Sequence, residues 1–189
     1  LLALAASGTA SAEDPAAKIQ VLLIAGDDVA PFHDWRDISE STREVLVESG
    51  RFDVRISEDP LILESNNALK GYDVIVFTMF NKSVPMITDQ AKENLIAFVQ
   101  NGKGFYSQHL ASASFGEWEE FGKLCGRHWV MGTSGHGPRS NFPVKIAKQD
   151  HPITRGLEGF KIFDELYAKL QGTGPIEVLV EAESDWSNQ

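Results

Sequence analysis

The sequence predicts an α/β domain built on a mostly parallel sheet with helices on both faces. Two observations indicate this fold: short apolar runs alternate along the chain with segments of helical periodicity, and several runs are apolar throughout. Continuous apolar runs are typical of parallel strands buried on both faces, and the alternation is typical of crossover connections between such strands. With 189 residues the chain is long enough for one well-buried domain and short for two.

The first half of the chain supplies the elements in order. Residues 19–25 and 72–78 are apolar runs that predict buried strands, and residues 52–57 alternate in the manner of an edge strand. Two helices are predicted between the strands, the first ending at Gly50 and the second near Gly102. Their positions follow from residues at helical spacing: Ile38, Thr42, Val45, Leu46 and Ser49 in the first, and Ile87, Ala91, Leu95, Phe98 and Val99 in the second.

The second half begins with a strand at 104–108 and a helix over 115–125. Residues 126–143 then show no sustained period, so we expect a long loop with a short strand at 128–131. Later strands are expected at 144–147 and 177–180. Long loops inside compact domains are usually functional or disordered, and the tryptophan and histidine content of this one favours function.

The charge of the chain limits its partners. The formal net charge is −10 and the pI is near 4.9, which disfavours nucleic acid and anionic membrane surfaces as partners. No segment has the length and apolar character of a membrane span, so membrane insertion is not expected. A neutral or cationic small ligand fits this charge better, and a homo-oligomer stays open.

The first twelve residues predict where the protein is located. Residues 1–12 carry no charge and end in Ala-Ser-Ala before Glu13, which is typical of the apolar part and cleavage site of a signal peptide. An Ala-rich disordered arm is the alternative. We therefore expect a periplasmic or secreted protein, in which Cys125, the single cysteine, cannot form an intrachain disulfide.

His109 is the first candidate for a functional residue. It follows the strand predicted at 104–108 and precedes a run of small residues. A buried parallel strand delivers side chains at this point to the carboxyl edge of the sheet, where α/β proteins build their sites. The alternative is a histidine that caps the next helix or is satisfied in the core.

Other histidines have different surroundings in the sequence. His136 lies between two glycines and has little local packing, which favours function, and His128 beside Trp129 is a weaker candidate. His151 precedes Pro152 in a turn and is interpreted as structural.

Six motifs together resemble the ThuA-like (trehalose utilisation) family, from about residue 18 to the end. They are His33-Asp-Trp-Arg36, the strand from Tyr72, Gly102 to His109 with the following Ala-Ser-Ala-Ser, Trp129 with Gly135-His136-Gly137, Asp150 to Leu157, and Asp164-Glu-Leu-Tyr167. The resemblance implies the flavodoxin-like, doubly wound fold of class I glutamine amidotransferases. Residues 13–189 would be a single ThuA-like domain, truncated at its C-terminus because family members normally continue into further strands.

The amidotransferase comparison fails at one residue. Those enzymes carry a nucleophilic cysteine at the elbow after this strand, where the present chain has His109. Cys125 lies at the end of the following predicted helix, where a thiol is more often plain packing. An amidotransferase or peptidase activity would require inhibition by alkylation of Cys125, and we do not favour it.

The resemblance implies a role in the catabolism of trehalose or a related disaccharide, alongside a sugar dehydrogenase that makes 3-keto sugars. A 3-keto group acidifies the C2 proton, so a base and an acid can cleave the glycosidic bond by elimination without a nucleophile. The expected acid/base pair is His109 and Glu165, with His136 stabilising charge or protonating the leaving oxygen. Adjacent Asp164 and Glu165 cannot both face the cleft, and the family pattern favours Glu165 over a solvated pair.

Five further residues are expected to bind the substrate: His33, Asp34, Trp35, Ser112 and Trp129. Trp35 would stack on a sugar ring and Asp34 would accept a hydroxyl. The structural alternative is an aspartate N-cap for the first helix, for which Asp37 is the better candidate, leaving His33 and Asp34 free.

Two alternatives stay open for this site. In the first, His33, His109 and His136 hold a divalent metal that polarises the ketone. In the second, the chain is a non-catalytic carbohydrate-binding or scaffold domain of a larger secreted protein, with Trp35, Trp118 and Trp129 as a stacking platform.

Overall fold

A computed structural model describes residues 17–183 of the chain. The signal-peptide remnant expected at residues 1–12 lies outside this range. Within it, no helix combines the length and apolar character needed to cross a bilayer.

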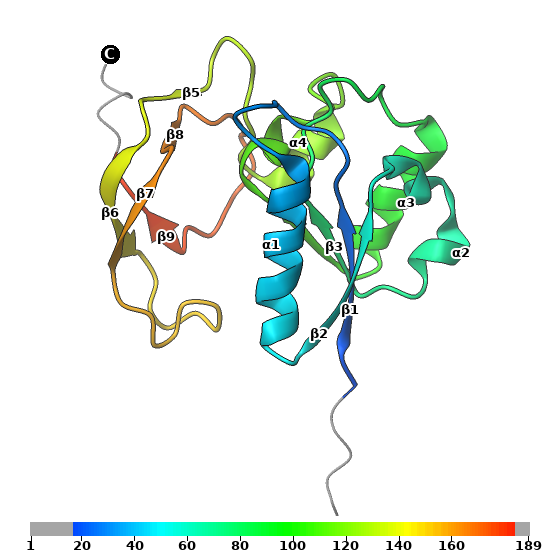
Figure 1. Ribbon diagram of the computed structural model, residues 1–189, viewed down its shortest axis with the longest axis horizontal. Helices are drawn as coiled ribbons and strands as arrows, with labels where there is room; N and C mark the ends of the chain where they lie inside the picture. Colours follow the sequence, from blue (N-terminus) through cyan, green and yellow to red (C-terminus); the bar gives the residue numbers. More distant parts are fainter. Residues whose placement is uncertain (1–16, 184–189) are drawn as a thin grey trace, which may run out of the picture.

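The centre of the fold is a four-stranded parallel sheet with the strand order β2-β1-β3-β4 (Figure 1). Its strands are β1 (Ile19–Ile24), β2 (Phe52–Ser57), β3 (Val74–Phe77) and β4 (Gly104–Ser107). Their register aligns Val21 with Val54 and Val74. The order doubles back between β1 and β3, which is the topological switch point of a flavodoxin-like sheet.

Helices cover both faces of the parallel sheet, as the sequence predicts. On one face, α1 (Trp35–Glu48) packs through Trp35 and Leu46 against Val21, Leu23 and Val76. On the other face lie η1 (Pro60–Glu64), α2 (Asn66–Leu69), α3 (Asp89–Gln100) and α4 (Glu119–Cys125), whose apolar side chains form one core with β1 and β3. The predicted α/β architecture is confirmed and is consistent with a flavodoxin-like fold.

Two predictions in this half of the chain need correction. The strand before His109 is not fully buried: β4 stands at the edge of the four-stranded sheet, and Tyr106 is 54% exposed. The helix expected over 115–125 begins only at Glu119. Phe115 instead has a left-handed backbone with φ 53° while its ring is buried against Phe77 and Phe121, so the chain turns before the helix starts.

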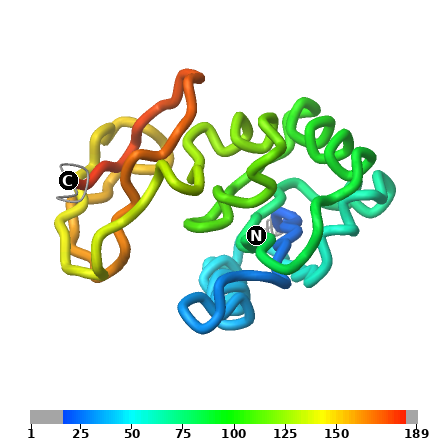
Figure 2. The backbone as a smooth tube through the Cα atoms, turned by 90° about the horizontal axis from the view of Figure 1, so that it is seen from above, coloured from blue at the N-terminus to red at the C-terminus, as the bar shows by residue number. Residues whose placement is uncertain are grey.

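The C-terminal segments form a separate antiparallel layer. In it, β6 (Ser140–Ile146) pairs with β7 (Phe160–Asp164) and β9 (Val180–Glu181), while β5 (Gly135–His136) pairs with β8 (Tyr167–Ala168). Figure 2 shows these segments, coloured yellow to red, gathered to one side of the parallel sheet. Together they form what we call the β layer.

The strands of the β layer differ in position from those expected from the sequence. The expected loop at 126–143 contains β5 and the start of β6, whereas the expected strand at 128–131 makes only a single bridge between His128 and Gln171. The strand expected at 144–147 begins earlier, at Ser140, and the strand expected at 177–180 appears as β9, Val180–Glu181. Hydrophobic periodicity reports burial. In β6 the less exposed face begins only at Phe142, after the exposed Ser140 and Asn141, and β7 is exposed from Phe160 to Phe163, so both leave an incomplete periodic signal.

Candidate active site

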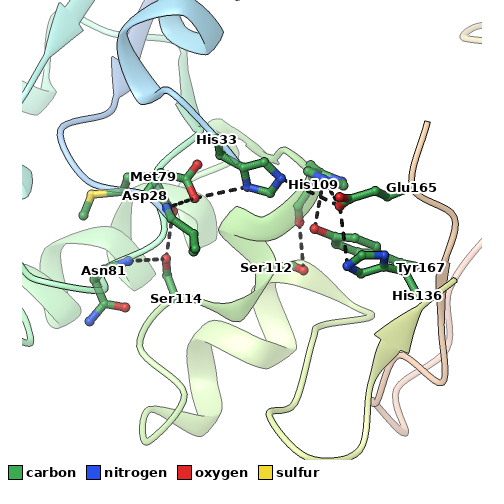
Figure 3. A network of polar contacts seen from close by, with 11 residues as sticks. Asp28, His33, Met79, Asn81, His109, Ser112, Ser114, His136, Glu165 and Tyr167 are labelled. Carbon is green, nitrogen blue, oxygen red and sulfur yellow. Dashed lines mark hydrogen bonds and ion pairs between the residues drawn. The ribbon is translucent and has the colours of Figure 1, made fainter. Parts of the chain in front are cut away.

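Three imidazoles and one carboxylate converge at the carboxyl edge of the parallel sheet. His33 comes from the β1–α1 loop and His109 from the start of η2 (His109–Ala113), directly after β4. The β layer supplies His136, at the end of β5, and Glu165, between β7 and β8. Figure 3 shows the four side chains pointing toward one another. Parallel sheets bind ligands at this edge, near the point where the strand order reverses.

One oxygen of Glu165 is the centre of the cluster. Its Oε2 lies 3.5 Å from His109 Nε2, 3.7 Å from His33 Nε2 and 3.7 Å from His136 Nε2. The Glu165 side chain is 16% exposed, so the carboxylate is largely withdrawn from water. The three imidazoles therefore surround a single carboxylate at slightly more than hydrogen-bond distance.

Backbone conformation fixes the direction of His109. The residue follows β4 with a left-handed φ of 51°, which turns the chain sharply into η2. Burial is the main cause that lowers the pKa of His109, and the charge of His33 acts in the same direction, against Asp164 and Glu165. Its imidazole therefore favours the neutral form more than an exposed histidine does.

Tyr167 is a site residue that the sequence did not single out. Its hydroxyl lies 2.9 Å from His109 Nε2, and the two rings stack with centroids 4.2 Å apart. Burial, together with the nearby Glu165, raises the pKa of the phenol, which holds it in the protonated form. The signal in the sequence was its spacing, because residues two apart in an extended chain face the same side and Tyr167 follows Glu165 by two.

Asp28 is the second residue that sequence reasoning missed. Its carboxylate is buried, accepts the N–H of Val29 at 2.7 Å and lies 3.3 Å from His33 Nδ1. Burial raises the pKa of Asp28, while the Val29 bond and His33 act in the opposite direction. Asp28 thus orients His33 from the side away from Glu165. The sequence feature that could have identified Asp28 is its position just after the first buried strand.

The residues expected to bind substrate through the first helix have structural contacts. Asp34, and not Asp37, is the N-cap of α1, with its carboxylate accepting the N–H of Arg36 at 2.9 Å. The expectation that Asp34 is free of a structural role was wrong, because its extended backbone places the carboxylate over the first turn. Trp35 packs on the sheet and lies under the Arg36 guanidinium, 4.0 Å from the ring centroid.

Ser112 and Trp129 lie close to the cluster. The hydroxyl of Ser112 donates to the carbonyl of His109 at 3.0 Å, which stabilises η2. The Trp129 ring meets Tyr167 edge-on at 4.6 Å between centroids and lies 6.0 Å from His136. Both residues therefore support the side chains of the cluster, and their predicted contacts with a substrate stay predictions.

Histidines outside the cluster, and the cysteine, have structural surroundings. His151 Nδ1 accepts the N–H of Ile153 at 3.2 Å within its turn, and the His128 ring lies against Gly122. Burial raises the pKa of the Cys125 thiol to about 11, partly offset by a hydrogen bond with Ser107. A thiol with so little thiolate at neutral pH is a poor nucleophile.

A cavity of about 1070 Å³ extends from the cluster along α1 and β4. This volume is slightly above the usual range for small-molecule sites, roughly 300–1,000 Å³. Its described lining includes five carboxylates and one guanidinium: Asp28, Asp34, Asp37, Asp164, Glu165 and Arg139. Asp164 and Glu165 both line the cavity, so the expectation that only one of them faces the cleft was wrong. Such a lining favours a neutral ligand over an anionic one.

The aromatic platform required by the binding-domain alternative is not assembled in the described residues. Trp35 packs on one face of the sheet, Trp118 stacks on Phe121 in the opposite core, and Trp129 lies against Tyr167. The cavity is lined by other residues.

The residues able to hold a metal ion differ in one member from the expected set. Ligand atoms of His33, His109 and Glu165 all lie within 4.8 Å of one another. Glu165 therefore stands where His136 was expected, and His136 lies next to that carboxylate.

Two solved structures of other proteins have a fold similar to that of this chain. The structure of a ThuA-like protein from Parabacteroides merdae is similar, with a TM-score of 0.77 and 24% identity over 91% of this chain and 71% of that one. A ThuA-like protein from Bacteroides uniformis has a TM-score of 0.69 and 20% identity over 93% of this chain and 72% of that one. At these identities the likeness shows the fold alone. No match was found among curated proteins.

The family is shown by the sequence itself. A family model described as ThuA, trehalose utilisation, matches residues 20–188, which is nearly the whole chain. The protein therefore belongs to the ThuA trehalose-utilisation family.

Proposed function

We propose that this domain cleaves a 3-keto-glycoside by acid/base elimination. Membership of the ThuA family supports a carbohydrate-related role. The observation that carries the finer proposal is the convergence of three imidazoles on one withdrawn carboxylate oxygen, at distances of 3.5–3.7 Å. Such a cluster offers a carboxylate base and imidazoles able to carry a proton within the span of one sugar ring, and it needs no nucleophile.

The proposed reaction begins with removal of the C2 proton of the keto sugar by the Glu165 carboxylate. The electron pair of that C–H bond forms an enolate on the C3 oxygen. The enolate then re-forms the C3 ketone, a C1–C2 double bond forms, and the C1–O bond breaks. The leaving oxygen takes a proton from an imidazolium, so the products are an enone and an alcohol, with no net oxidation or reduction.

Each group of the cluster has a role in this scheme. His109, paired with Glu165, returns the proton, and His136 stabilises the developing charge or protonates the leaving oxygen. The raised pKa of Tyr167 keeps its hydroxyl protonated beside His109 Nε2, where it can donate to the enolate oxygen. The acidic lining of the cavity suits a neutral sugar.

The test follows glycosidic cleavage of 3-keto-trehalose and of trehalose by NMR in deuterated water. We expect cleavage of the keto sugar alone, with loss of the C2 proton signal as the enone forms. His109→Ala and Glu165→Gln should each lower kcat/KM by about 10²–10⁴-fold, the usual contribution of a general acid or base. His151→Ala and Glu158→Gln are matched controls outside the site and should keep wild-type turnover. Undiminished turnover in both site variants would reject the proposal.

The keto substrate has a consequence for the pathway. Because the C3 ketone is absent from ordinary disaccharides, an oxidising enzyme of the sugar-dehydrogenase class must supply it. Coupled assay of such an enzyme with this domain on unmodified trehalose should restore cleavage. If the coupled reaction does not cleave trehalose although this domain cleaves the keto sugar directly, the two enzymes do not act in one pathway.

Export of the protein is a further part of the proposal. The uncharged residues 1–12 and their Ala-Ser-Ala ending support it. Fractionation of the expressing cell, with mass spectrometry of the mature N-terminus, tests it. A cytosolic chain that keeps these residues would contradict it.

A further inference from the structure

The contacts of His136 fix the tautomer of its neutral form. Its Nδ1 lies 2.6 Å from the carbonyl oxygen of Gly137, and a carbonyl can only accept a hydrogen bond. The hydrogen of neutral His136 is therefore on Nδ1. Its Nε2, which lies 3.7 Å from Glu165 Oε2, carries a lone pair directed into the site.

His33 is oriented in the same way by a different partner. Its Nδ1 lies 3.3 Å from Asp28 Oδ1, on a buried carboxylate that already accepts the N–H of Val29. An ionised carboxylate also only accepts, so the hydrogen of His33 is on Nδ1 and its Nε2 lone pair points at Glu165 Oε2, 3.7 Å away. A carboxylate behind a histidine is the usual arrangement in metal sites, where it fixes the tautomer and raises the basicity of the ligand nitrogen.

The centre of the cluster therefore collects acceptors. The Nε2 atoms of His33 and His136 each lie 3.7 Å from Glu165 Oε2, and in the neutral imidazoles no hydrogen lies between either nitrogen and that oxygen. Acceptors placed in this way repel one another unless a cation lies among them.

The spacing of the acceptors suits a metal ion. Bonds of about 2.0–2.2 Å in tetrahedral geometry place ligand atoms roughly 3.3–3.6 Å apart. Glu165 Oε2 lies 3.5 Å from His109 Nε2 and 3.7 Å from His33 Nε2, and the three ligand atoms all lie within 4.8 Å of one another. Both contacts of Glu165 Oε2 are close to the spacing that such an ion requires, and binding would draw the ligand atoms of the two histidines toward the same spacing.

We propose that His33, His109 and Glu165 bind a divalent transition-metal ion, with His136 as a fourth group beside it and Asp28 as the positioning residue of His33. Two imidazoles and a carboxylate are the ligands of catalytic zinc and of related transition-metal sites, whereas Ca²⁺ and Mg²⁺ prefer oxygen ligands. The site opens onto the cavity, which leaves room for a substrate oxygen at an open position.

This inference rests on the proposed function for its chemical use. An ion at this point would take the ketone oxygen of the substrate and stabilise the enolate as a Lewis acid. Glu165 would bind through Oε2 and keep Oε1 as the base. His109 would then serve as a ligand, so the Nε2 lone pair of His136 would take the proton from Glu165 and pass it to the leaving oxygen.

The experiment measures metal binding in the absence of sugar, on the full chain freed of metal by a chelator and dialysed. Calorimetric titration with Zn²⁺ should give one ion per chain, and Mg²⁺ should not compete. His33→Ala, His109→Ala and Glu165→Gln should each weaken Zn²⁺ binding by more than the roughly 10–100-fold expected for a residue behind a ligand. His151→Ala, an imidazole outside the cluster, should bind as the wild type does.

Two further variants guard against loss of the fold. Asp28→Asn keeps the shape of the side chain and should weaken Zn²⁺ binding by about 10–100-fold. Tyr167→Phe removes only a hydroxyl next to the site and should keep the affinity within a few-fold. Binding that is absent in the wild type, or that is equally strong in the three ligand variants, would overturn the metal site.

Turnover of 3-keto-trehalose is measured separately, with the metal-free and the reloaded protein. Specific Zn²⁺ binding without turnover in either form would keep the metal site and reject the elimination. Turnover that is equal in both forms would overturn the catalytic use of the ion and leave the acid/base scheme in place.

Discussion

Tyr167 shows how the surroundings of one residue decide its chemistry. It contacts His109 through both its hydroxyl and its ring, and it lies opposite His136 across the β5–β8 pair. If its phenol donates to the enolate oxygen, Tyr167→Phe should lower kcat by about 100-fold, as loss of one such donor does, with little change in KM. Steady-state kinetics on the keto sugar measure this. A changed KM with an unchanged kcat would instead assign Tyr167 to substrate binding.

Cys125 is expected to react slowly with alkylating reagents. Its pKa is raised to about 11 by burial, so the thiolate fraction below that pH is small and grows about tenfold with each pH unit. Labelling with iodoacetamide, followed by mass spectrometry, should therefore be slow at pH 8 in the folded protein and still rising between pH 9 and 10. In urea the labelling rate of Cys125 should level off at a pH near the ordinary thiol pKa of about 8.5. Equal labelling of the folded and unfolded protein at pH 8 would contradict this assignment.

The candidate residues differ in how far they could be foreseen. The position of His109 followed from a local pattern, because a strand and the residues after it are adjacent in sequence. Asp28 follows β1 in the same way, but its role depends on a loop conformation that brings His33 onto its carboxylate. Tyr167 acquires its role by contact with His109, 58 residues away in the sequence. The Asp34 cap was missed because both Asp34 and Asp37 are suitable by type, and only the backbone conformation distinguishes them.

Among the elements, the turn after β1 depends on a single glycine. Gly26 has a φ of +114°, and a Cβ there would lie 1.9 Å from the carbonyl oxygen of Glu58. Gly26→Ala should lower the free energy of unfolding by about 3 kcal/mol or more, because both the backbone and the contact oppose it. Gly50→Ala is the control: its φ is +73° with no described atom within 4 Å of a Cβ, so a cost of about 1 kcal/mol is expected. Urea denaturation measures both, and similar losses would refute the role of the contact.

The same turn explains why the fold and the site are connected. Gly26 precedes Asp27, whose carboxylate accepts the N–H groups of Ser83 and Val84 and so joins the loops after β1 and β3. Asp28 and His33 extend from this joined segment. The elements of the parallel sheet were predictable because buried strands leave continuous apolar runs, while β5, β7 and β8 in the β layer depend on pairing between distant segments and leave no such pattern.

At the scale of the whole molecule, charge should select the substrate. The chain carries a net charge of −10, and the cavity adds carboxylates to the surroundings of the cluster. Turnover of a neutral keto sugar should therefore change less than about twofold between 0.05 and 0.5 M NaCl. An anionic keto-uronide should bind more weakly, and its KM should fall as salt screens the repulsion. Kinetics of the two substrates over this range test the prediction, and a salt-independent KM for the uronide would count against it.

The left-handed backbone of His109 has a consequence for the molecule as a whole. A φ of 51° costs a non-glycine residue about 1 kcal/mol or more, so the fold would be relieved by a glycine at this position. His109→Gly should consequently unfold at the same or a higher urea concentration than the wild type while losing turnover. Such a result would indicate that the imidazole at this turn serves the proposed activity at a cost in stability.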